Sequence, residues 1–271
     1  MSLLESGYNP KYLEAIKKFR LIDDTFFNVC FDGSNECMQL LLRIIFGRDD
    51  IIVKETVAQH SAHNLYGRSV RFDVLAIDSD GKIYNVEIQR TDEGAIPKRA
   101  RFNTCQIDSR EIAKGTKFKD FPEVWVIFIT ENDVLGANLP LYHVERIITE
   151  LNRPFDDASH IIYANGAYRG EDALGLLMQD FFCEDPSKMH YGELAKRVDF
   201  FKHENKGVNS MCEIMNELMN ELIIKERNEV LNEASTNIAL KMLRDNKPME
   251  EIIRYSDLPL ARIQELAQSL R

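Results

Sequence analysis

The chain has 271 residues, of which 44% are hydrophobic, so it can bury the core of one large domain or of one domain with an appendage. It contains no run of about 18 apolar residues, and we expect neither a membrane span nor a secretory signal peptide. Its five cysteines show no CxxC spacing, which favours free thiols in a reducing cytoplasm. The net charge is −10, so the chain as a whole does not attract nucleic acid. Contact with phosphates would need a local basic surface.

The N-terminal part of the chain predicts helices followed by a strand. Apolar residues at helical spacing indicate a first helix, Asp24 and Thr25 can cap a second, and Ser34 can cap a third that ends at Gly47. Glu36 lies in the first turn of that third helix, where a carboxylate commonly interacts with the helix dipole. The predicted ranges are residues 8–20, 24–31 and 34–46 for the helices and residues 51–58 for the strand.

A loop over residues 59–69 contains His60 and His63. A pair at this spacing can ligate zinc, but no partnering Cys or His cluster follows at a usual distance in sequence. Solvated loop histidines are therefore the favoured interpretation.

Two runs with period-two alternation come next, over residues 71–77 and 84–90, and each is typical of a strand with two different faces. The turn between them contains Gly81, which suits the left-handed position of a three-residue hairpin loop. With that loop, Asp73 falls directly opposite Glu87, and their Cβ atoms are expected about 4.5–5.5 Å apart.

The pairing of Asp73 with Glu87 indicates a metal site. Two carboxylates at this separation repel each other, and one would take up a proton unless a cation lay between them. Mg²⁺ favours one or two carboxylates together with water and phosphate oxygens. The hairpin therefore favours a hydrolytic metal site for a phosphodiester. The alternative is a pair of solvated acids on an exposed strand face, paired with Arg71.

A basic segment follows the hairpin. After a loop over residues 91–96, Pro97 suits the first position of a helix that continues to about residue 113. Residues 90–119 contain eight Lys or Arg and four Asp or Glu, so their net charge is +4. Phosphate binding needs such a local excess. An ordinary solvated helix with a Lys-rich loop is the alternative.

The rest of the chain predicts strands and then helices. A continuous apolar run over residues 123–130 is typical of a strand buried on both faces. Two further strands are predicted over residues 141–147 and 160–164. The chain becomes helical after about residue 171, so we predict domains over residues 1–170 and 171–271.

The longest predicted helix, over residues 208–244, has an apolar stripe that either packs on its own domain or forms a dimer seam. Two short helices follow, over residues 248–255 and 259–270. Their outline is that of a helix-turn-helix that reads DNA, and a packing or self-association tail is the alternative.

Several short motifs occur in an order that resembles one known family. They are Asp24-Thr25-Phe26-Phe27, Arg71-Phe72-Asp73-Val74, Asn85-Val86-Glu87-Ile88-Gln89-Arg90, Pro97-Lys98-Arg99-Ala100-Arg101-Phe102 and Val126-Ile127-Phe128-Ile129-Thr130. Over roughly residues 20–220 the chain is similar to the Rpn-type family of recombination-promoting nucleases and transposases. That family belongs to the PD-(D/E)xK nuclease superfamily, whose motif Asp73 and Glu87-Ile88-Gln89 match with Gln in place of the usual Lys.

The resemblance implies a restriction-endonuclease-like α/β fold, with a mixed central sheet between helices and a helical C-terminal region. It also implies a metal-dependent DNA endonuclease. The implied ligands of Mg²⁺ or Mn²⁺ are Asp73, Glu87 and the backbone carbonyl of Ile88, with Glu36 as a further candidate on an early core helix. Gln89 would join Asp73 and Glu87 as a catalytic residue that orients water.

The implied partners are DNA and, through the C-terminal helices, a second copy of the chain. The candidate DNA-binding residues are Arg90, Lys98, Arg99 and Arg101. Two positions depart from the family pattern, because Asn103 follows Phe102 where an aromatic pair is usual and Phe118 replaces a tyrosine. Both departures affect the expected DNA contacts more than cleavage.

The sequence contains no GxSxG, Walker A, GxGxxG, zinc-deaminase or HExxH pattern that would support another chemistry. Two function classes remain. The chain is either an active metal-dependent endonuclease or a catalytically inactive DNA-binding or dimerising relic of a mobile element.

Overall fold

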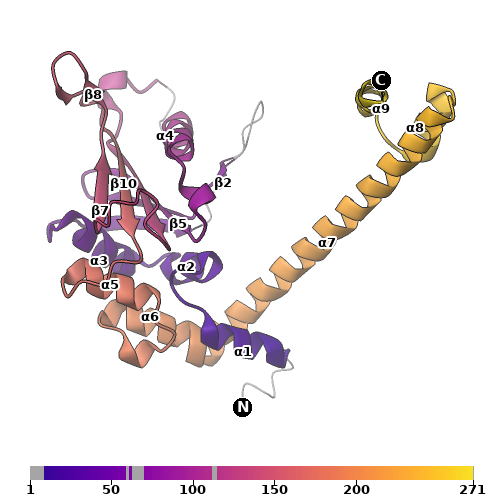
Figure 1. The fold of residues 1–271 in the computed structure, drawn as a ribbon. Coiled ribbons are helices and arrows are strands. Elements are labelled where there is room, and N and C mark those ends of the chain that lie inside the picture. Colours follow the sequence, from indigo (N-terminus) through magenta and orange to yellow (C-terminus); the bar gives the residue numbers. More distant parts are fainter. Residues whose placement is uncertain (1–8, 59–60, 63–69, 112–114, 271) are drawn as a thin grey trace. The chain divides into compact units, whose positions relative to one another are not determined.

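The structure is a computed structural model that describes residues 9–58, 61–62, 70–111 and 115–270 (Figure 1). The predicted loop histidines, His60 and His63, and the side chain of Arg71 lie outside this described part. None of the described helices is both long and apolar enough to cross a membrane.

Six strands form one mixed sheet in the order β1-β4-β5-β6-β10-β7. The central strands β5, β6 and β10 run parallel, and β1, β4 and β7 pair with their neighbours in antiparallel fashion. The bounds of the six strands are β1 Val53–Ala58, β4 Val74–Asp78, β5 Ile83–Gln89, β6 Val124–Thr130, β7 Leu141–Val144 and β10 Ser159–Asn165. Two small ribbons pair β2 Ser61–Ala62 with β3 Val70–Arg71, and β8 Ile147–Ile148 with β9 Arg153–Pro154.

The helices lie before, between and after the strands. Their bounds are α1 Pro10–Lys18, α2 Asp24–Phe31, α3 Asn35–Phe46, α4 Pro97–Glu111, α5 Ala173–Phe181, α6 Gly192–His203, α7 Asn205–Arg244, α8 Met249–Ser256 and α9 Leu260–Ser269. Short 3₁₀ turns occur at η2 Asp92–Ala95, η3 Phe118–Asp120 and η4 Pro186–Lys188. Gly47 ends α3 with a φ of 61°, as predicted for its C-cap. The cap predicted for α2 is wrong, because Asp23 holds the N-cap position and Asp24 is the first helical residue.

Helices cover both faces of the sheet, which confirms the restriction-endonuclease-like α/β architecture. Alternate residues of β5 point to opposite faces. Ile83 packs in one cluster with Ile107 of α4, whereas Tyr84 contacts Phe46 of α3 with ring centroids 5.7 Å apart. The Glu87 side chain is four positions from Ile83 and therefore faces α4.

The hairpin of β4 and β5 has the predicted register, because Ile77 pairs with Ile83 across the turn. Gly81 has a φ of 80°, the left-handed conformation that the loop requires. The predicted strand over residues 71–77 is interrupted, however, and β4 begins only at Val74. Asp73 lies in a bend before β4, because hydrogen bonds that involve side chains replace the regular ladder there.

The chain divides into two compact units, residues 1–208 and 209–271. The first unit contains the sheet together with α5 and α6, and both of these helices pack on α3. The sequence predicts a domain boundary after residue 170, whereas the boundary between the compact units lies after α6. In the second unit the end of α7 packs with α8 and α9 around Ala239, Ile252, Ile263 and Leu266.

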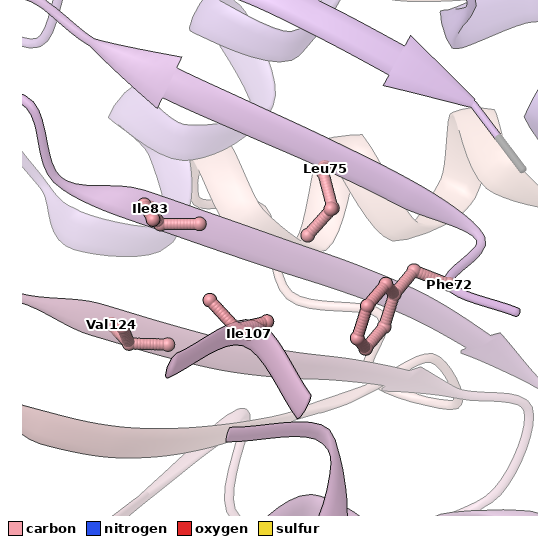
Figure 2. Packing of buried hydrophobic residues seen from close by; sticks show 5 residues of the cluster. All are labelled: Phe72, Leu75, Ile83, Ile107 and Val124. Atoms are coloured by element: carbon pink, nitrogen blue, oxygen red, sulfur yellow. The ribbon is translucent and has the colours of Figure 1, made fainter. Parts of the chain in front are cut away.

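A compact apolar cluster joins the hairpin to α4. Its buried members are Phe72, Leu75, Ile83, Ile107 and Val124 (Figure 2). Phe72 is fully buried and directly precedes Asp73, so packing at this position fixes the bend that carries the acidic side chain.

We expect Phe72→Ala to lower the free energy of unfolding by about 3–5 kcal/mol, because the truncation leaves a cavity in the cluster. Phe118→Ala is the matched control, since Phe118 is 88% exposed and its loss should change stability by less than about 0.5 kcal/mol. Urea unfolding followed by circular dichroism measures both. Equal effects of the two substitutions would contradict the assignment of Phe72 to the core.

Candidate active site

The Asp73 and Glu87 carboxylates are linked across the hairpin by main-chain hydrogen bonds. The Asp73 N–H donates to Glu87 Oε1 at 3.3 Å, and the Ile88 N–H donates to Asp73 Oδ2 at 2.8 Å. The Gln89 carbonyl accepts from Glu131 on the β6 side, and backbone groups alternate along a strand, so the Ile88 carbonyl points to the Asp73 side. The structure thus brings together the three groups that the sequence predicted as metal ligands.

Glu87 is fully buried, and Arg99 of α4 balances its charge. Arg99 Nη2 donates to Glu87 Oε2 at 2.5 Å, and Asn85 Nδ2 donates to Glu87 Oε1 at 2.9 Å. Asn103 Nδ2 donates in turn to Asn85 Oδ1 at 3.0 Å. A buried polar chain therefore runs from α4 through β5 to the acidic pair.

Asn85 and Asn103 are site residues that sequence reasoning missed. The sequence marks Asn103 only as a departure from an aromatic pattern that affects the expected DNA contacts. In the structure both asparagines are fully buried, and Asn103 acts on Glu87 through Asn85. A sequence signal existed for Asn85, because it alternates with Glu87 on one strand face.

The surroundings of the acidic pair disfavour two negative charges. Burial, together with the charges of Glu87 and Asp24, raises the pKa of the Asp73 carboxyl from 3.8 to about 9. Burial also raises the pKa of Glu87, against the lowering influence of Arg99 and the Asn85 amide. Glu87 has more donors than Asp73, so Asp73 is the carboxyl that holds a proton when no cation is bound.

The carboxylate from an early helix that acts on Asp73 is Asp24, at the start of α2. Asp24 is exposed, and Asn28 Nδ2 donates to its Oδ1 at 2.7 Å. Glu36, the candidate named from sequence, lies on α3 and lines a pocket of about 420 Å³ with Lys196 of α6. The sequence predicts Asp24 as a helix cap and as part of a family motif, and neither feature indicates its position beside Asp73.

Gln89 is half-buried on the same strand as Glu87, two residues further along. Its carboxamide lies against Gly94 of η2, where an added Cβ would overlap the Gln89 Oε1 atom. The carbonyl of Gly94 also accepts from Arg99 Nη1 at 3.2 Å. The η2 turn therefore contacts both the catalytic candidate Gln89 and the counter-ion of Glu87.

The candidate DNA-binding residues differ in their surroundings. Arg90 donates to Asp23 at 3.0 Å and to Glu131 at 3.1 Å, so carboxylates already offset its charge. Lys98 and Arg101 are exposed on α4, and neither forms an ion pair with any residue that the structure describes. These two side chains supply free positive charge on the helix that also carries Arg99.

A pocket of about 580 Å³ opens beside Asp24 and Arg90. Lys18 and Arg20 also line it, so cationic side chains from α1, the segment after α1 and the end of β5 meet there. Asp23, Asp24 and Glu184 line the same pocket, so three carboxylates balance its three cationic side chains. The free positive charge therefore lies on the exposed part of α4.

The donor set of the site is made of oxygen atoms. Across the described ranges, no group of three or more His, Cys, Asp or Glu side chains is arranged to hold a metal ion. Two carboxylates and a main-chain carbonyl fit Mg²⁺, which keeps several waters and needs few protein ligands. The raised pKa of Asp73 supports this fit, because a cation would favour the charged form.

The fold and the site together define a nuclease-like α/β protein with a paired acidic centre on a hairpin. A family model described as PD-(D/E)XK nuclease family transposase matches residues 24–165, which is more than half of the chain. The chain belongs to this family. No curated protein and no solved structure matches it significantly.

The raised pKa of Asp73 predicts a pH-dependent stability in the absence of metal. The native state keeps a proton that the unfolded chain releases above its ordinary pKa of 3.8, so the free energy of unfolding falls as pH rises toward about 9. We expect Asp73→Asn to flatten this fall, because an amide does not titrate.

The measurement is urea unfolding with EDTA between about pH 5.5 and pH 8.5. Asp120→Asn, a change at an exposed carboxyl, is the control and should keep the wild-type slope. An unchanged slope in Asp73→Asn would show that Asp73 is ionised throughout this range.

Proposed function

We propose that this protein is a metal-dependent DNA endonuclease that hydrolyses phosphodiester bonds, of the transposase-associated, recombination-promoting type. The observation that carries the proposal is the pair of carboxylates linked across the hairpin, with a cation, Arg99, already held against one of them. Membership of the nuclease family supports it. We place the reaction in the cytoplasm, where the five free cysteines would stay reduced.

Asp73, Glu87 and the Ile88 carbonyl would hold Mg²⁺ or Mn²⁺. When bound, the metal would lower the pKa of a water molecule and polarise a phosphate oxygen. Gln89 would hydrogen-bond that water or the phosphate, since an amide can donate and accept but is a poor base. Water would add to phosphorus as the bond to the 3′ oxygen breaks, leaving a 5′ phosphate and a 3′ hydroxyl.

Arg99 has a double role in this proposal. Without metal it offsets the buried charge of Glu87. If a divalent cation took that place, the guanidinium would be released and become available to a DNA phosphate, together with the exposed Lys98 and Arg101. Arg90 is a weaker DNA candidate, because its contacts with Asp23 and Glu131 must first be given up.

We propose that the C-terminal helices form the interface between two copies of the chain. The helices α8 and α9 bury Ile252 and Ile263 against the end of α7, which supports a packing role over DNA reading. Apolar side chains in the middle of α7, including Leu222 and Leu231, remain exposed. A second copy of the chain would cover them.

Nicking of supercoiled plasmid with Mg²⁺ or Mn²⁺ tests the activity. We expect Asp73→Asn and Glu87→Gln each to lower the rate by at least about 100-fold, because each removes a ligand. Asp24→Asn should lower it by about 10–100-fold, whereas Glu36→Gln, in the separate pocket that Lys196 also lines, should retain it. DNA that is retarded but not cut, with no effect of Asp73→Asn, would establish the inactive relic instead.

The role of Arg99 predicts a linked effect on stability and metal response. Arg99→Met leaves a buried carboxylate without its partner and should cost about 3–5 kcal/mol in EDTA. Mn²⁺ should then stabilise this variant more than the wild type, because the cation replaces the missing charge. Urea unfolding with and without Mn²⁺ measures both effects.

Arg101→Met is the matched control, since Arg101 is exposed on the same helix and should affect stability by less than about 0.5 kcal/mol. If Mn²⁺ stabilises Arg99→Met and the wild type equally, Arg99 and the metal do not compete for the Glu87 carboxylate.

A further inference from the structure

Residues 219–234 of α7 are exposed on every side of the helix. An isolated helix of this length is only marginally stable in water without packing. The stretch nevertheless carries large apolar side chains, among them Leu222, Ile223, Val230 and Leu231, each more than half exposed. Clusters of exposed apolar side chains on a soluble protein mark an interaction surface.

Residues spaced four apart along α7 lie in rows on the helix surface, and there are four such rows. Two adjacent rows are mainly apolar, one row is charged, and the fourth is Asn-rich with Ile224 as its apolar member. The first apolar row is Leu218, Leu222, Glu226, Val230 and Ala234, and the second is Met219, Ile223, Arg227, Leu231 and Ser235. Each apolar row is interrupted by one charge at its centre, and the two charges have opposite signs.

The two apolar rows are related to each other by reversal of the chain direction. A reversal of chain direction centred on the peptide bond between Glu226 and Arg227 places each residue of the first row on a residue of the second. Leu222, Val230 and Ala234 then fall on Leu231, Ile223 and Met219, and Glu226 falls on Arg227. Only the outermost position differs, because Leu218 falls on Ser235. A surface that is self-complementary in this way fits a twofold interface, in which both copies use the same patch.

We propose that α7 packs in antiparallel orientation against α7 of a second copy of this chain, with the crossing point at Glu226 and Arg227. Rows spaced four residues apart interlock when helices cross at about −50°. Leu222 would then lie beside the partner's Leu231, and Glu226 beside the partner's Arg227. A parallel pair would instead bring Glu226 toward the partner's Glu226.

Charge favours a second copy over DNA as the occupant of this surface. One row beside the apolar surface carries Glu221, Glu229 and Glu233 against Lys225, and the row on the other side carries no charge, so the surroundings of the apolar surface are acidic on balance. Acidic flanks repel phosphates. The antiparallel pairing rests on the dimerisation proposed above but not on the nuclease activity, so the pairing and the activity can each fail without the other.

The mass of the full-length protein in solution tests the interface. Light scattering and sedimentation should give twice the 31.3 kDa of the chain for the wild type. Leu222→Glu with Leu231→Glu should raise the dissociation constant at least about 100-fold, because both central apolar contacts are lost. Both side chains are exposed in the single chain, so each copy should keep its fold.

Charge reversal tests the orientation. Glu226→Arg and Arg227→Glu should each weaken the dimer, and the double variant should restore it, because the opposite charges again face each other. Glu221→Arg, on a polar row, is the control and should leave the mass unchanged.

Oxidative cross-linking gives a second readout, in a Cys105→Ser background that removes the exposed native thiol. Leu222→Cys with Leu231→Cys should form covalent dimers, and Leu222→Cys alone should not. A wild type that remains a monomer at high concentration, or a cross-link through Leu222→Cys alone, would overturn the proposal.

Discussion

The buried carboxylate of Glu87 is the constraint on which the site depends. A carboxylate removed from water is costly unless a cation and hydrogen bonds compensate it. Here Arg99 supplies the cation, and Asn85 and the Asp73 main chain supply the hydrogen bonds. These partners come from β5, from the bend before β4 and from α4, so three separate parts of the chain must be in place together.

This arrangement explains why the hairpin departs from regular geometry at the end that carries Asp73 and Glu87. The strand predicted through Asp73 is interrupted there, because the Asp73 carboxylate accepts the Ile88 N–H that a continuing ladder would use. The bend leaves Asp73 partly exposed while Glu87 is sealed. A cation would therefore approach from the Asp73 side. Arg99 would have to move away from the Glu87 carboxylate to let the cation bind it.

Charge is distributed unevenly over the chain, and the distribution matches two different tasks. Exposed Lys98 and Arg101 carry positive charge on α4, the helix that holds Arg99 against Glu87. In α7 the repeat of acidic and apolar positions produces a helix that suits another helix better than a phosphate backbone. The net charge of −10 thus does not contradict a local DNA-binding surface.

The sequence by itself determined the order of the strands and core helices, the register of the hairpin and the meeting of Asp73 with Glu87. It did so because period-two alternation and a left-handed Gly81 leave little freedom in how two adjacent strands pair. Only the tertiary structure decided that Asn103 supports Glu87, that Arg99 is its counter-ion and that Asp24 lies beside Asp73. Those contacts join segments far apart in the chain, and local patterns do not specify which helix face meets which strand.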